Sequence, residues 1–397
     1  MGNFISRVAD RATLVAAPRL WIEGAAIQQL SKTLELPGMV RAVGMPDLHP
    51  GRGYPIGAAF FTAGRFYPAL VGGDIGCGVS VWTTELPAAK VKLDKLDKLV
   101  GNLDGPLTGE ERQHMAEAYP ELDARVAQVE QALADAGLDP GWMRAAPSLG
   151  SGNHFLELQR LEDVLDPDAA DDKVLNTKHL NLVVHTGSRG LGGAILREHV
   201  EQFGHRGLAE GTPEALDYVR RHQAAVAFAE LNRWLVAVRV LVRLGVEGSQ
   251  RLDVNHNTVT RERFDGADGW VHRKGATPMS GELVLIPGSR DHFSYLVRPI
   301  GEASESSLGS LAHGAGRKWM RADCKARLGR HIKGKDVSKG ALGSRIICND
   351  KDLVYEEAGA AYKPIDTVID SLVGAGLVEA VASFRPVLTY KTRGECC

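Results

Sequence analysis

Val71-Gly72-Gly73-Asp74-Ile75-Gly76-Cys77-Gly78 is the stretch around which the rest of the chain can be organised. An apolar run before it, Tyr67 to Val71, and a β-branched run after it, Val79 to Thr84, predict two strands. The glycines between them let the backbone bend tightly and approach an ion or a phosphate closely. Asp74 offers a hard oxygen and Cys77 a soft thiolate. Such a loop could put both donors on one metal ion, or its sulfur could bridge two.

A glycine-rich hairpin with a buried structural cysteine is the alternative interpretation, and for this stretch alone it would be the better one. Later segments that carry histidines shift the balance. In Gly150-Ser151-Gly152-Asn153-His154, glycines lead into an alternating strand, so His154 lies near the start of that strand. The apolar run Leu180 to Val184 predicts a buried strand that delivers His185 into a Gly/Ser turn. Arg189 in that turn is a natural ligand for phosphate.

Two further histidines also lie at the ends of predicted elements. His256 follows a short strand and stands between Asn255 and Asn257, which could orient its ring. His313 lies among small residues, ahead of a helix expected to start near Arg317, and backbone N–H groups at a helix start bind anions well. For each lone histidine, a structural role is the alternative.

The segments around Asp47 and after Arg317 each allow two interpretations. By composition, Met45 to Gly51 is a loop, and taken alone it favours a turn in which Asp47 bonds its own backbone. From Arg317 to Arg345 the chain is dense in lysine and arginine. This run is either a solvated helix face or, beside a catalytic histidine, a track for a phosphate backbone.

Composition limits the class of protein. The chain has 397 residues, of which 44% are hydrophobic, enough for a large core. Its formal net charge is −2, so nucleic-acid binding would need a local basic patch. The five cysteines are scattered and odd in number, which suits a reducing cytosol, and we expect a cytoplasmic protein. We find no apolar run long enough to cross a bilayer and no signal peptide.

The element pattern predicts one α+β domain over residues 1–397. It has central β structure, a long core helix and peripheral helices, without repeats or a composition break. Residues 86–140 should form a helical cover, and 392–397 a loose tail. Thr212 and Pro213 predict the start of the core helix, and Gly245 its end. Shorter helices are expected over Trp21 to Leu36, Lys90 to Val100, Glu110 to Ala136 and from about Leu191. Short strands are expected over Leu283 to Ile286 and Val387 to Tyr390.

One carboxylate, one thiolate and three imidazoles are enough to hold two metal ions. The donors are Asp74, Cys77, His154, His185 and His256. Two metals a few ångströms apart can clamp both oxygens of a phosphoryl transfer, and these mixed donors do not select between Zn and Mn. The chain contains no Walker A motif and no Lys-x-Asp-Gly nucleophile motif. A neutral imidazole could attack phosphorus in place of such a lysine.

Seven segments together resemble the RtcB family of RNA-splicing and RNA-repair ligases, in the family's order and over nearly the whole chain. They are MPDLHPG (45–51), VGGDIGCG (71–78), GSGNHFLE (150–157), HTGSRG (185–190), His256-Asn257, Pro287 to Ser289 with Ser294, and AHGAGR (312–317). The opening MGNF segment and MPDLHPG resemble the branch coupled to release factor H, which implies ribosomal RNA repair. The residues after Ser289, Arg290-Asp291-His292, depart from the family's more usual Met-Gly and small residues.

The resemblance implies a GTP- and Mn-dependent ligase that joins RNA 2′,3′-cyclic phosphate or 3′-phosphate ends to 5′-hydroxyl ends. His313 would take GMP from GTP as a phosphoramidate, and the GMP would then activate the RNA 3′-phosphate. The five donors above would hold two Mn²⁺ ions, with Cys77 as the bridge. Arg189 and Arg317 would hold phosphates, and Asp47 would assist. The residues expected around the guanylate are Asn153, Glu157, Ser289, Ser294, His313, Gly314, Ala315, Gly316 and Lys391.

The implied partners are RNA with broken ends, from tRNA or rRNA, and a helper protein is compatible with this activity. We expect a monomer without membrane association. The main alternative is a dinuclear metal-dependent phosphodiesterase or phosphatase that acts on RNA ends. It would need the same metal ligands but neither a nucleotide nor a nucleophilic His313. A non-catalytic RNA-binding protein with a structural metal is a third possibility. Only the ligase should form a covalent GMP adduct.

Overall fold

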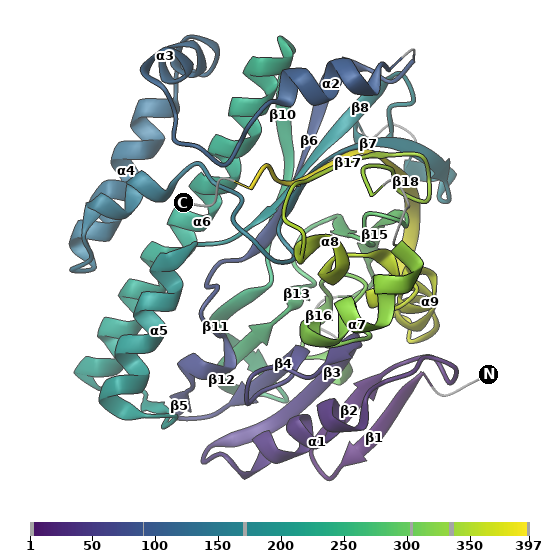
Figure 1. Ribbon diagram of the computed structural model, residues 1–397. Coiled ribbons are helices and arrows are strands. Elements are labelled where there is room, and N and C mark those ends of the chain that lie inside the picture. The colour runs from purple at the N-terminus through teal and green to yellow at the C-terminus, as the bar shows by residue number, and fades with distance from the viewer. Residues whose placement is uncertain (1–3, 90, 170–172, 302–304, 333–336, 395–397) are drawn as a thin grey trace.

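The computed structural model describes residues 4–89, 91–169, 173–301, 305–332 and 337–394. Their strands form two large sheets (Figure 1). The six-stranded sheet has the order β1 (Ile5–Ala9), β2 (Ala12–Val15), β3 (Met39–His49), β4 (Ile56–Thr62), β12 (Ala267–Lys274) and β11 (Asn257–Phe264). The larger sheet has the order β10 (Gly248–Asn255), β6 (Gly78–Pro87), β8 (His179–Thr186), β7 (Phe155–Val164), β18 (Val378–Thr392), β15 (Ser294–Pro299) and β14 (Val284–Ile286), and β17 (Arg345–Cys348) pairs with β18.

Two short pairs of strands and nine α-helices complete the described part of the chain. The pairs are β5 (Arg65–Phe66) with β9 (Leu208–Ala209), and β13 (Ala276–Pro278) with β16 (Ser310–Ala312). The helices are α1 (Gly24–Lys32), α2 (Leu93–Val100), α3 (Gly109–Ala118), α4 (Leu122–Asp135), α5 (Gly190–Phe203), α6 (Pro213–Leu244), α7 (Arg321–Ile332), α8 (Leu353–Glu356) and α9 (Ile365–Gly374). The expected mixed α+β fold with a long core helix is therefore confirmed.

Helix α6 is the core helix, and its ends lie where the sequence predicted them. The Thr212 hydroxyl accepts a hydrogen bond from the Ala215 N–H, and Gly245 ends the helix in the left-handed conformation. The helix packs on β6 and β8, and helices α2 to α5 contact it (Figure 1). Fully buried side chains such as Trp82 and Phe228 fill the space between α6 and the sheet.

The chain passes directly from the larger sheet to the six-stranded sheet at one residue, His256. Strand β10 ends at Asn255 in one sheet, and β11 begins at Asn257 in the other. The N–H of His256 donates to the Cys77 carbonyl at 2.7 Å, and its carbonyl accepts from the Ala276 N–H at 3.1 Å. These bonds hold the connection beside the glycine-rich loop that precedes β6.

Two expectations about strands were wrong. The segment Tyr67 to Val71 is not a strand but contains a 3₁₀ turn, Pro68–Leu70, because proline fixes φ and gives no N–H to a ladder. The segment Met45 to Gly51 is mostly strand rather than loop, since β3 continues to His49. There the pairing of β3 with β4 is interrupted by a bulge, which accommodates the proline in the strand.

Several helix boundaries also differ from those expected. The first helix begins at Gly24 and continues as a 3₁₀ turn to Glu35. The single helix expected over Glu110 to Ala136 is two helices, α3 and α4, separated at Pro120. Helix α2 begins at Leu93, and Lys90 lies outside the described residues.

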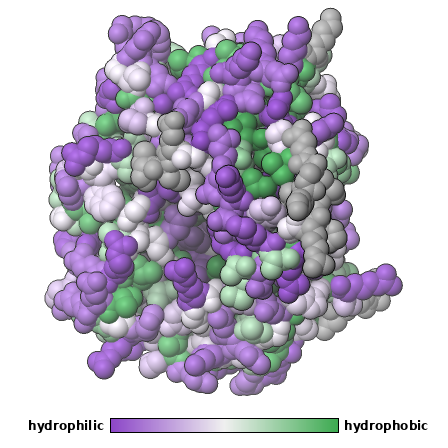
Figure 2. Space-filling model, viewed as in Figure 1, coloured by the Kyte–Doolittle hydropathy of each residue, from purple (hydrophilic) through white to green (hydrophobic). Residues whose placement is uncertain are grey.

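The expected loose tail starts within a strand, because β18 includes Thr392, and residues 395–397 are outside the described part. No helix of the described residues combines the length and apolar character needed to cross a membrane. On the face seen in Figure 2, hydrophilic residues predominate, and the surface is hollowed near the middle.

Candidate active site

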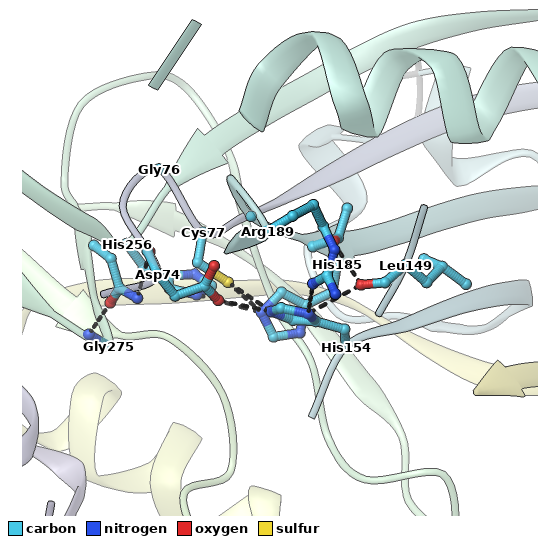
Figure 3. A network of polar contacts seen from close by, with 12 residues as sticks. Asp74, Gly76, Cys77, Leu149, His154, His185, Arg189, His256 and Gly275 are labelled. Atoms are coloured by element: carbon cyan, nitrogen blue, oxygen red, sulfur yellow. Dashed lines mark hydrogen bonds and ion pairs between the residues drawn. The ribbon is translucent and has the colours of Figure 1, made fainter. Parts of the chain in front are cut away.

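The five expected metal ligands converge, although they come from four separate segments. Asp74 and Cys77 lie on the glycine-rich loop, and the imidazoles of His154 and His185 turn toward them (Figure 3). The Cys77 Sγ atom is 3.3 Å from Nε2 of His154 and 3.3 Å from Nε2 of His185. Nε2 of His185 is also 3.3 Å from Nε2 of His256, and Nε2 of His154 is 2.8 Å from Asp74 Oδ2.

These side chains form two triads that share one atom. Cys77, His185 and His256 make one triad, and Asp74, Cys77 and His154 the other, with the donor atoms of each within 4.8 Å of one another. Sulfur, imidazole nitrogen and carboxylate oxygen are all donors that transition metals accept. The Nδ1 atom of His154 lies 3.1 Å from the Leu149 carbonyl, so an Nδ1–H there leaves the Nε2 lone pair for a metal. The residues therefore fit a pair of ions that share the sulfur.

Burial controls the protonation of these groups. It raises the pKa of the Cys77 thiol well above its usual value and lowers the pKa of His185 and His256 well below theirs. Burial also opposes ionisation of Asp74, but the neighbouring His154 holds its pKa at about 2. Burial thus favours the neutral imidazoles of His185 and His256, which can donate lone pairs, whereas a metal must displace the thiol proton.

Arg233 of α6 fixes the loop that carries two of the ligands. Its buried guanidinium donates to the carbonyls of Gly76 at 2.7 Å and Thr186 at 3.0 Å. It also binds Asp253 Oδ1 and Asn255 Oδ1, both at 2.6 Å. One side chain therefore ties the glycine-rich loop to the ends of β8 and β10.

The two asparagines beside His256 serve the backbone around it. Asn255 binds Arg233, while Asn257 donates to the Asp74 carbonyl at 3.0 Å and accepts from the Gly275 N–H at 2.7 Å. The expectation that they orient the imidazole directly is not supported, because their contacts position the loop instead.

Arg189 lies next to the metal triads in a strained backbone conformation. It caps α5 with φ 57° and ψ −139°, a region that side chains rarely adopt. Its guanidinium is 3.2 Å from Ser148 Oγ and 3.1 Å from Nδ1 of His154. A Cβ at Gly150 would lie 1.7 Å from this guanidinium, so only glycine leaves room for the arginine.

His313 stands between the metal triads and a large cavity. Its Nδ1 lies 2.5 Å from Asp47 Oδ2, and its backbone N–H donates to the same oxygen at 3.1 Å. The ring centroids of His313 and His256 are 4.9 Å apart. A neutral His313 ring that donates its Nδ1–H to Asp47 has its lone pair on Nε2, as a nucleophile requires.

The cavity has a volume of about 450 Å³ and contains most of the expected guanylate residues. The lining residues that the sequence analysis named are Asn153, Glu157, Ser289, His313, Gly314, Ala315, Gly316, Arg317 and Lys391. Ser294 lies behind the wall, where its Oγ accepts from Gln159 Nε2 at 2.9 Å. Lining residues that the sequence did not single out are His49, Arg52, Phe155, Trp319, Glu357, Tyr362 and Thr389.

Charged groups in the cavity wall compensate one another. Burial raises the pKa of Glu157 to about 7, against hydrogen bonds from Gln159 and Thr389. Lys391 Nζ lies 3.1 Å from the carboxylate of Glu357. Burial opposes the ionisation of Glu357, but Lys391 and neighbouring arginines hold its pKa below the usual value. Arg317 also donates to Glu357, at 3.2 Å, so part of its donor capacity is used within the protein.

Glu357 and its neighbours explain where the sequence prediction was incomplete. Glu357 belongs to no motif, and only the fold brings it to Lys391 and Arg317. The unusual residues after Ser289 have partners of their own: Asp291 accepts from the Gly359 N–H at 2.9 Å, and His292 Nδ1 lies 2.7 Å from Ser289 Oγ. Of these three residues only Arg290 lines the cavity, and Asp291 and His292 support the turn behind it.

The anion site expected at a helix start beside His313 is absent from the described residues. Helix α7 begins at Arg321, and a loop separates it from His313. Gly316 in that loop has φ +70°, and a Cβ there would lie 2.3 Å from the Asp47 carbonyl oxygen. Helix α7 does present a solvated face, since Lys325 and Arg327 are exposed, while Arg321 pairs with Glu356 at 3.2 Å.

Comparisons with known proteins agree with this arrangement. A family model described as tRNA-splicing ligase RtcB matches residues 29–139 and 107–392. RNA-splicing ligase RtcB2 of Escherichia coli is 48% identical over 394 residues, covering 99% of both chains. RNA-splicing ligase RtcB of Mycobacterium tuberculosis is 31% identical over 433 residues, covering 90% of this chain and 99% of that protein. RNA-splicing ligase RtcB1 of E. coli is 30% identical over 421 residues, covering 95% and 97%. With matches of this extent, the chain belongs to the RtcB family of RNA-splicing ligases.

Proposed function

We propose that the protein is a GTP- and Mn-dependent ligase that joins RNA 2′,3′-cyclic phosphate or 3′-phosphate ends to 5′-hydroxyl ends, in repair or splicing of tRNA or rRNA. The observation that carries this proposal is the position of His313. Its imidazole is held by buried Asp47, lies against His256 of a metal triad, and lines the cavity that contains the expected guanylate residues.

In the first step, Nε2 of His313 attacks the α-phosphorus of GTP. An N–P bond forms, the bond to the β-phosphate oxygen breaks, and pyrophosphate leaves. The Nδ1 proton stays on the ring, where it is hydrogen-bonded to Asp47. The carboxylate of Asp47 stabilises the positive charge that develops on the ring. Two Mn²⁺ ions held by Asp74, Cys77, His154, His185 and His256 would polarise phosphate oxygens.

The next two steps transfer GMP to RNA and then release it. An oxygen of the RNA 3′-phosphate attacks the GMP phosphorus, and the P–N bond breaks to return the lone pair to His313. The RNA 5′-hydroxyl then attacks the activated 3′-phosphate, loses its proton and displaces GMP. We propose that Arg189, whose guanidinium lies 3.1 Å from Nδ1 of His154, holds a phosphate oxygen through these steps.

The cavity suits a guanine base and its phosphate. Glu157 offers carboxylate oxygens, which can accept hydrogen bonds from the N–H groups of guanine. Lys391 would supply positive charge for the phosphate, and the N–H groups of Gly314 and Gly316 would supply donors, since the Ala315 N–H already donates to the Pro287 carbonyl at 3.2 Å.

The test is incubation of the purified protein with GTP labelled at the α-phosphate and Mn²⁺, followed by a denaturing gel and intact mass. Wild type and a His114→Ala control, altered at an exposed histidine of α3, should carry one GMP. His313→Ala should carry none.

If Mn-loaded wild type forms no adduct, the ligase proposal is wrong. Hydrolysis of cyclic phosphate ends by the same sample would then favour the dinuclear phosphodiesterase. That alternative is supported by the metal triads alone and gives His313 no covalent role.

A further inference from the structure

A bulge of several residues in β3 presents Asp47 to His313. The pairing of β3 with β4 passes from Gly44 opposite Ala58 to His49 opposite Ile56. The four residues 45–48 therefore face Gly57 alone. A bulge redirects a side chain and leaves backbone groups without partners in the ladder, so the carbonyls on either side of Asp47 need other donors.

Lys363 supplies those donors from a distant part of the chain. Its side chain is buried, and Nζ donates to the Pro46 carbonyl at 3.0 Å and to the Leu48 carbonyl at 2.6 Å. Its backbone N–H donates to the Gly316 carbonyl at 3.0 Å. One residue thus connects the bulge that carries Asp47 with the loop that carries His313.

Asp47 is enclosed on its other sides. A Cβ at Gly57 would lie 2.8 Å from Asp47 Oδ1, and the backbone of Gly316 packs against the Asp47 carbonyl. Among the described residues, Oδ1 has no hydrogen-bond donor, so a nearby positive charge helps to offset the cost of burying this oxygen. Burial lowers the pKa of Lys363 to about 8, with the Asp47 charge opposing this, which leaves an ammonium group at neutral pH.

We propose that Lys363 is a positioning residue for the guanylylation of His313. By fixing the peptide groups before and after Asp47, it holds the carboxylate on Nδ1 of His313. Lys363 is not among the residues that line the cavity, so it acts through Asp47 rather than on GTP. This inference rests on the proposed function.

The first experiment replaces Lys363 with methionine, which keeps the length of the side chain and removes its donors and charge. Three quantities are compared with wild type: the Kd of GTP, the rate constant for GMP adduct formation at saturating GTP, and the joining of RNA whose 3′-phosphate already carries GMP. A misplaced catalytic group can reduce a rate by about 100-fold, so we expect adduct formation to fall roughly 10- to 100-fold. GTP binding and joining of the activated RNA should stay within about twofold, since neither needs attack by His313.

A double-mutant cycle identifies the route of the effect. If Lys363 acts through Asp47, adding Lys363→Met to Asp47→Ala should slow adduct formation no further than Asp47→Ala alone. Independent roles would multiply the two effects. Circular dichroism and the melting temperature show whether each variant folds. If the methionine variant does not fold, Lys363→Gln, which is uncharged and shorter than lysine, carries the same comparison.

The outcomes separate this inference from the proposal beneath it. Absence of an adduct on wild type overturns the proposed function. A wild-type adduct together with an unchanged rate in Lys363→Met overturns the positioning role. Parallel loss of adduct formation and of joining of activated RNA, or multiplied effects in the double mutant, would also overturn it, because a general structural role predicts both.

Discussion

Glu157 shows how burial changes the chemistry of a single carboxyl group. Its pKa rises from an ordinary value of 4.5 to about 7 in the folded protein. The folded state therefore binds a proton that the unfolded chain has already lost. The resulting stabilisation is complete below about pH 4.5 and disappears as the pH rises through about 7.

We expect this dependence to disappear in Glu157→Gln, whose side chain does not titrate. Urea unfolding of the metal-free proteins between about pH 5 and about pH 8 measures the difference in the free energy of unfolding. Wild type should lose stability relative to the variant as the pH rises. A difference that stays constant across this range would show that Glu157 titrates normally.

At the same scale, sequence reasoning found the residues that lie in motifs and missed those that act through packing. Asp74, Cys77 and His154 stand at strand ends or in glycine-rich loops, where function collects, and their donor atoms do converge. Glu357 and Lys363 stand in ordinary surroundings along the chain. Their importance comes from burial and from bonds to residues more than thirty positions away, which no local pattern encodes.

Helix α6 contributes to the site through Arg233, and its removal should destabilise the whole fold. Arg233→Leu would leave the Asp253 carboxylate and two carbonyls without their donor. Breaking a buried pair in this way costs about 3–5 kcal/mol. Arg220→Leu on the same helix is the control, because its pair with Asp217 is exposed and such pairs contribute about 0–1 kcal/mol.

Urea unfolding at neutral pH compares the two variants with wild type. A much larger loss of unfolding free energy for Arg233→Leu is the expected result. Equal losses would mean that the guanidinium is not a principal support of the loop.

The predictability of an element depended on whether its signal was local. Both ends of α6 could be predicted, because a capping threonine, a proline and a glycine act on adjacent backbone. The second half of β3 was mistaken for a loop, since its proline is accommodated by a bulge and its carbonyls are bonded by distant Lys363. The turn at Pro68 interrupts an apolar run whose hydrophobicity alone suggests a strand.

At the scale of the molecule, the two sheets should unfold together, as one domain predicts. The chain passes from one sheet to the other at His256, and Arg233 binds the end of β10 next to this connection. Trp82 lies in the eight-stranded sheet and Trp270 in the six-stranded sheet, so the difference in fluorescence between wild type and Trp82→Phe or Trp270→Phe reports each of these two among the six tryptophans. Both signals and far-UV circular dichroism should give one midpoint in urea. Distinct midpoints would indicate two domains.

The order of the strands was beyond the sequence pattern. Strand β18, near the end of the described chain, pairs with β7, β15 and β17, and its partners in β7 lie more than two hundred residues away. Such pairing depends on tertiary packing, and periodicity along the chain contains no record of it. Family resemblance could indicate the fold as a whole, while the position of each strand required the structure.

At Arg189, the stability of the backbone and the position of the guanidinium favour different residues. An arginine at φ 57° and ψ −139° carries a strain of about 1–3 kcal/mol that glycine would not. Only glycine fits at position 150, because a Cβ there would collide with the guanidinium that lies beside His154. Backbone stability alone would favour glycine at position 189, but glycine would remove the positive charge. The backbone strain at Arg189 is therefore a stability cost of holding a cation beside His154, and under the proposed function that cation would serve phosphate chemistry.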